Sequence, residues 1–159
     1  PSAMPYGDPD AEALPKPVVR TADQLLAETA AKRGDWAQVI RLTKDARGEQ
    51  TSLRSLNRQA HAWAHSRLAF AVRAVRDERY EEARRAMNEV NVTMKGEPES
   101  VDAERGFEAL VHMRDMTVLP EESPLRATVR KTAYEQMRGT RWAPLFSEVP
   151  MPSRAISKK

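Results

Sequence analysis

Two stretches of the sequence, Arg33-Gly-Asp-Trp-Ala-Gln-Val-Ile-Arg-Leu42 and Glu78-Arg-Tyr-Glu-Glu-Ala-Arg-Arg-Ala-Met87, share one pattern that decides the fold. In each, a polar turn leads into an aromatic residue, Trp36 or Tyr80, and a small or β-branched apolar residue follows three positions later. Residues three apart lie on one face of a helix. The pattern is therefore typical of the second helix of a hairpin, with Trp36 and Tyr80 as buried packing residues.

Proline and glycine positions delimit the expected helices. No proline occurs between Pro17 and Pro98, and a proline inside a helix costs about 3 kcal/mol or more, so long helices fit in that interval. We expect an all-α fold of about six helices in antiparallel hairpins, at about residues 22–33, 36–47, 51–76, 80–90, 101–116 and 124–139. The expected N-terminal caps are Thr21, Asp35, Ser100 and Ser123.

The ends of the chain differ from its middle. Residues 1–18 are expected to form a flexible proline-rich arm, in which residues 1–3 are interpreted as a cloning remnant before Met4. Residues 19–140 are expected to form a single helical domain, and residues 141–159 an extended C-terminal arm. The apolar residues of this arm lead to two hypotheses: it docks back along a groove, or it serves as a linear motif for another chain.

The segments 32–39 and 78–83 resemble the turn and second helix of tetratricopeptide repeats, and they are similar to the related pentatricopeptide repeats. The resemblance implies a short superhelical stack with a concave face that binds a partner. Trp36 and Tyr80 are 44 residues apart, whereas tetratricopeptide units repeat at about 34 residues. An irregular helical bundle is therefore the alternative architecture.

Composition limits the class of function. The chain has 26 Lys and Arg against 23 Asp and Glu, and Arg154, Lys158 and Lys159 account for the difference, so the rest is balanced and gives little support for nucleic-acid binding. The chain has no cysteine, which excludes disulfides and cysteine-ligated metals. No apolar run approaches the roughly 20 residues of a membrane span, and no signal peptide is recognisable. We expect the cytoplasm or another reducing compartment, without membrane insertion.

Two histidines and two arginines are the candidate partner-binding residues. His61 and His65 are four apart and share a face of the third helix, as metal-binding histidines do, but the HExxH pattern is absent and we predict no metal. With Arg54 and Arg58 they are the expected polar contributors to the concave face. His112 is expected on an exposed, charged helix face.

A second candidate surface combines basic and aromatic side chains near the C-terminus. Such a surface can hold phosphates and stack bases, and it suits an acidic protein partner equally well. Its members are Arg126, Arg130, Lys131, Tyr134, Arg138, Arg141 and Trp142.

The sequence favours a non-catalytic function. It contains neither a phosphate-binding glycine loop nor a nucleophile elbow, and we predict no catalytic residue and no cofactor. We therefore predict an interaction scaffold, adaptor or assembly factor whose partner is another protein or a peptide segment. The alternative is an RNA-binding helical-repeat protein that uses the basic and aromatic C-terminal helix.

Overall fold

The computed structural model describes residues 21–46 and 51–147. They form six α-helices and one short 3-10 helix, with no strand in either range, which confirms the all-α expectation. The elements are α2 (Ala22–Lys32), α3 (Trp36–Thr43), α4 (Thr51–Arg76), α5 (Tyr80–Thr93), α6 (Pro98–Thr117), α7 (Pro124–Met137) and η2 (Ala143–Phe146).

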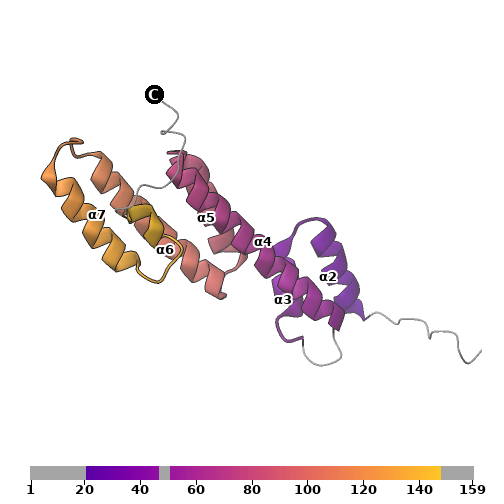
Figure 1. Ribbon diagram of the computed structural model, residues 1–159. Coiled ribbons are helices and arrows are strands. Elements are labelled where there is room, and N and C mark those ends of the chain that lie inside the picture. Colours follow the sequence, from indigo (N-terminus) through magenta and orange to yellow (C-terminus); the bar gives the residue numbers. More distant parts are fainter. Residues whose placement is uncertain (1–20, 47–50, 148–159) are drawn as a thin grey trace, which may run out of the picture.

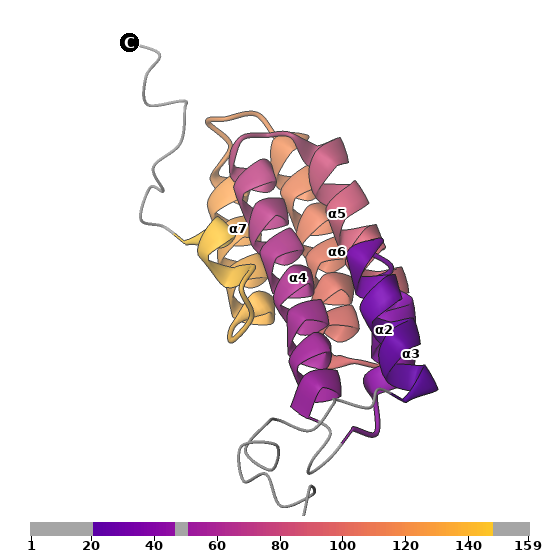
Figure 2. The same cartoon turned by 90° about the vertical axis from the view of Figure 1, so that its right-hand side faces the viewer.

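The helices are arranged as three consecutive pairs, α2 with α3, α4 with α5 and α6 with α7 (Figure 1). The long helix α4 is central, because it contacts α2, α3, α5, α6 and η2 (Figure 2). Alanine occupies many of its buried positions and allows neighbouring backbones to approach closely. The buried residues of α4 are Leu53, Ala60, Ala64, Leu68, Ala71, Val72, Ala74 and Val75.

The two matching stretches build the same turn. Gly34 and Glu78 occupy equivalent places and both adopt the left-handed conformation, with φ of +74° and +61°. In both turns the next residue donates its backbone N–H over 2.8 Å to a carbonyl at the end of the preceding helix, Asp35 to Ala30 and Arg79 to Ala74. The shared sequence pattern thus corresponds to shared backbone geometry, although Glu78 adopts this conformation without the freedom of glycine.

The aromatic residue after each turn is only half-buried. Trp36 and Tyr80 pack against the edge of the core, whereas Val39 and Ala83, three positions later, are fully buried. Both aromatics are therefore packing residues, as predicted, but they are only partly buried, because each ring begins its helix at the margin of the core.

Three of the four expected caps are confirmed. The side chains of Thr21, Asp35 and Ser123 each accept a hydrogen bond from a backbone N–H of the first helical turn. Ser100 is not a cap, because α6 already begins at Pro98, where proline is tolerated at the first helical position. Its hydroxyl instead donates to the Asn91 side-chain oxygen at 2.7 Å and to the Asn91 carbonyl at 3.2 Å.

Two expected helix ends differ from the structure. The loop expected at 91–99 is shorter, since α5 continues to Thr93 and α6 starts at Pro98. The second helix, expected to reach residue 47, ends at Thr43. The expected N-terminal arm and residues 148–159 lie outside the described residues.

The expected domain boundary at residue 140 is wrong for the segment that follows it. Trp142 and Phe146 are among the largest fully buried side chains, so residues 141–147 belong to the helical domain and not to an extended arm. Their apolar side chains leave water by packing on α6 and α7. His112, expected to face solvent, packs edge-on against Phe146 with ring centroids 6.0 Å apart. Residues 141–147 therefore pack on the helices, whereas the rest of the arm, to which both hypotheses also apply, lies outside the described residues.

Among the described helices, none is both long enough and apolar enough to cross a membrane.

Candidate partner-binding site

His61 and His65, both expected on the partner-binding face, lie against the buried carboxylate of Glu99 at the start of α6. His61 Nδ1 is 2.6 Å from Glu99 Oε2, and His65 Nε2 is 3.1 Å from the same oxygen. The Glu99 side chain is only 4% exposed. A buried carboxylate needs hydrogen-bond donors, and the two imidazoles supply them to Oε2. The other oxygen, Oε1, has no hydrogen-bond partner among the described residues. The two histidines therefore link α4 to α6.

Arg141 completes this network from the C-terminal segment. Its Nε donates to Asp102 Oδ2 at 2.7 Å, and a second guanidinium nitrogen donates to His65 Nδ1 at 2.8 Å. Because that nitrogen accepts, the proton of a neutral His65 ring lies on Nε2, which faces Glu99. Trp142 adds a hydrogen bond from its Nε1 to the Asp102 carbonyl at 2.9 Å. The segment 141–146 is thus fastened to α4 and α6.

The expected concave site is therefore occupied in part by the chain itself. The two arginines assigned to it, Arg54 and Arg58, lie at exposed positions nearer the start of α4, whereas His61 and His65 contact α6 and the C-terminal segment. The four predicted residues lie on one face of α4. In the structure Arg54 and Arg58 are at exposed positions, whereas His61 and His65 belong to the hydrogen-bonded network with Glu99 and Arg141.

Of the basic and aromatic residues predicted as a second surface, five lie on or directly after α7, whereas Arg141 and Trp142 are engaged within the fold. Lys131 and Tyr134 are exposed on α7 and Arg130 is half-buried there, whereas Arg126 Nε donates to the Leu119 carbonyl at 3.0 Å. Arg138 is exposed and lies 3.7 Å from Glu135. Arg141 is engaged by Asp102 and His65, and Trp142, as a fully buried side chain, offers no face for a base to stack on.

No group of three or more His, Asp or Glu side chains in residues 21–46 and 51–147 is arranged to hold a metal ion.

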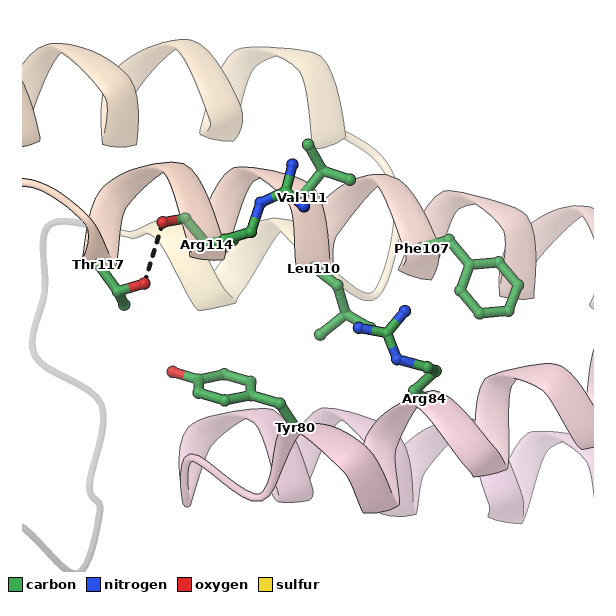
Figure 3. A pocket seen from close by; sticks show the side chains of 7 residues that line it. All are labelled: Tyr80, Arg84, Phe107, Leu110, Val111, Arg114 and Thr117. Carbon is green, nitrogen blue, oxygen red and sulfur yellow. Dashed lines mark hydrogen bonds between the residues drawn. The ribbon is translucent and has the colours of Figure 1, made fainter.

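The candidate site is a cleft between α5 and α6. It has a volume of about 230 Å³. Figure 3 shows side chains from both helices directed toward it, with the Tyr80 ring at one end and the Phe107 ring at the other. The lining residues are Tyr80, Arg84, Phe107, Leu110, Val111, Arg114 and Thr117.

The periodicity of the two helices explains how these side chains come together. Tyr80 and Arg84 are one turn apart at the start of α5, and Phe107, Leu110, Val111 and Arg114 follow at spacings of three, four and seven on α6. Leu110 is buried and forms the floor, whereas Val111 is 46% exposed at the rim. The cleft is therefore apolar at its base and open to a ligand.

The polar groups of the cleft carry positive charge or neutral donors. Arg84 and Arg114 are exposed, and no carboxylate is among the lining residues. Burial raises the pKa of the Tyr80 hydroxyl above its ordinary value of about 10, and the nearby Glu78 carboxylate raises it further. The hydroxyl thus stays protonated at neutral pH and can donate a hydrogen bond.

This cleft was not predicted from the sequence, in which Tyr80 was interpreted as a buried packing residue and neither Arg84 nor Arg114 was a candidate for binding. One feature of the sequence could have indicated the cleft: on each helix an arginine follows one turn after an aromatic or apolar residue, Arg84 after Tyr80 and Arg114 after Leu110.

Comparisons of the chain with protein-family models, with curated proteins and with solved structures find no match. The proposal below rests on the geometry of the chain itself.

Proposed function

We propose that this protein is a non-catalytic interaction module, an adaptor or assembly factor built on tetratricopeptide-like helical hairpins, and that the α5–α6 cleft docks a segment of a partner protein. The observation that carries the proposal is the cleft itself, in which apolar side chains lie between two exposed arginines. A groove between two helices that offers an apolar floor and a polar rim suits recognition of a peptide segment.

The size of the cleft favours a side chain over a metabolite. Sites for small-molecule ligands usually enclose about 300–1,000 Å³ and bury most of the ligand, whereas this cleft has about 230 Å³ and is open. Partner proteins commonly place a single anchoring side chain in a pocket, and that anchor supplies much of the binding energy. Phe107, Leu110 and Val111 would contact such an anchor.

The cleft is favoured over the surface formed by α4 and α6, where the sequence analysis expected the partner. On that surface Trp142 is already buried against α6, and Arg141 contacts both helices. A partner that bound there would first have to displace this segment and lose its hydrogen bonds. Binding in the α5–α6 cleft requires no such displacement.

A selection from a random peptide library displayed on phage tests the proposal. We expect peptides that bind the wild-type protein and lose most of their binding to Val111→Asp, because the new carboxylate lies at the rim of the apolar floor. Leu125→Asp is the matched control, since Leu125 is 58% exposed on α7 and outside the cleft. The proposal is wrong if no peptide is enriched, or if Val111→Asp and Leu125→Asp bind the enriched peptides equally well.

A further inference from the structure

The lining of the α5–α6 cleft carries two positive charges and no negative one. Two of its seven lining residues, Arg84 on α5 and Arg114 on α6, are arginines, and none is acidic. Figure 3 shows the Arg84 guanidinium next to Leu110 and the Arg114 guanidinium next to Val111.

Both guanidinium groups are available to a ligand. Arg84 lies 3.4 Å from Glu81, but the two side chains are 59% and 72% exposed. A pair so accessible to water contributes little stability, so a partner carboxylate can replace Glu81 at small cost. The Arg114 guanidinium makes no hydrogen bond or ion pair within residues 21–46 and 51–147. Each arginine can therefore form a charge-assisted hydrogen bond with a carboxylate.

The Tyr80 hydroxyl adds a neutral hydrogen-bond donor at the end of the cleft opposite Phe107. It has no hydrogen-bond partner in the part of the chain that the structure describes. A protonated phenol can donate to a carboxylate oxygen and would do so without adding charge. Three donors of this kind, two charged and one neutral, therefore surround an apolar floor.

We propose that the cleft recognises an acidic peptide segment, which seats one aliphatic or aromatic side chain on Leu110 and Val111 and directs carboxylates to Arg84 and Arg114. This inference rests on the proposed function and specifies the chemistry of the partner. The apolar anchor supplies affinity by burial, whereas the carboxylates supply orientation and selectivity among partners.

A protein segment fits this cleft better than single-stranded RNA does. RNA-binding surfaces combine positive charge with exposed aromatic faces on which successive bases stack. Here the side chains between the two arginines are aliphatic, Leu110 and Val111, and both aromatic residues of the cleft are half-buried at its ends. The cleft therefore has the positive charge of an RNA-binding surface but lacks the exposed aromatic faces on which bases stack.

The experiment compares a peptide selected on the wild-type protein with a version in which every Asp and Glu is replaced by Asn and Gln. We expect the acidic peptide to bind about tenfold more tightly than the neutral one, the combined effect of two partly exposed charge pairs. The double variant Arg84→Gln/Arg114→Gln should lose this preference while its affinity for the neutral peptide is unchanged. Arg85→Gln, a neighbour on α5 outside the cleft lining, is the charge-matched control and should keep the preference.

Each outcome of the experiment decides a different question. If peptides bind in the cleft but the acidic and neutral versions bind equally, the inference is overturned and the proposed function stands. If Arg85→Gln abolishes the preference as fully as the double variant does, the carboxylates are not held by Arg84 and Arg114 and the inference also fails. Displacement of the peptide by a single-stranded RNA oligonucleotide, at a concentration where a neutral peptide has no effect, would point to nucleic acid and overturn it. If no cleft-dependent peptide is selected, both proposals fall.

Discussion

Replacing Gly106 by alanine should destabilise the fold, although the same change in an ordinary helix is favourable. Gly106 lies within α6 and faces the indole ring of Trp142. A Cβ atom at this position would be 2.6 Å from Trp142 Cζ2, 2.9 Å from Cη2 and 3.0 Å from the Met87 sulfur. Carbon atoms in contact are normally about 3.5–4.0 Å apart, so the ring or the helix has to move.

The size of the effect follows from two opposing contributions. Forcing one extra carbon into a packed core costs about 1–3 kcal/mol, whereas alanine in place of glycine stabilises a helix by about 1 kcal/mol. Trp142 is fully buried and held by Asp102, so it cannot yield as the far end of a flexible side chain would. With the nearest ring atom at 2.6 Å, the packing cost lies in the upper part of that range, about 2–3 kcal/mol. We therefore expect a net loss of about 1–2 kcal/mol, which for a chain of this size lowers the melting temperature by about 2–8 °C.

Urea unfolding of a double-mutant cycle separates the two contributions. Trp142→Leu should itself be costly, though by less than the about 3–5 kcal/mol typical of replacing a buried tryptophan by alanine. In that background Gly106→Ala no longer meets the indole ring, so it should be neutral or stabilising. The reasoning is refuted if Gly106→Ala stabilises the wild-type protein, or if it costs the same in both backgrounds.

Two further predictions concern single side chains. Arg141→Ala should destabilise the protein by about 1–2 kcal/mol, because it breaks the half-buried ion pair with Asp102. The Arg138 side chain is 71% exposed, so Arg138→Ala should change the unfolding free energy by no more than about 0.5 kcal/mol. Equal urea midpoints for the two variants would contradict the stabilising role of the Arg141 network. Because the folded-state pKa of Tyr80 is raised, the unfolded chain loses this proton first, and the stability that depends on the protonated hydroxyl is present below about pH 10 and declines above it. Phenolate absorbance, assigned with Tyr80→Phe, should show the Tyr80 titration at lower pH in Glu78→Gly, and an unchanged titration would exclude Glu78 as a cause.

The sequence predicts the backbone of this protein well where local signals are strong. Capping residues such as Thr21 and Asp35, together with the proline-free interval, place most helix ends within a few residues. These signals act within one turn of the chain, so no tertiary information is needed. The same reasoning failed at Ser100, because Pro98 and Ser100 both favour a helix start and only the packing of Ser100 on Asn91 shows which is used.

The sites are less predictable because they depend on contacts between distant residues. His61 and His65 share a helix face, as predicted, but the carboxylate that they contact is 38 residues from His61 in sequence. Arg138 and Arg141 look alike in sequence, yet one is exposed and the other is bound by Asp102. The cleft likewise depends on how α5 packs against α6, which places Arg84 next to Leu110. No periodicity within one helix specifies such a pairing.

Changes in methyl NMR chemical shifts on addition of a selected acidic peptide would show directly whether the α5–α6 cleft binds a partner segment. The account predicts that the largest shift changes occur at the methyl groups of Leu110 and Val111. Leu25, Leu26 and Leu125 are exposed elsewhere and should be unaffected at the same peptide concentration. Largest changes at these distant leucines, with Leu110 and Val111 unmoved, would contradict the account.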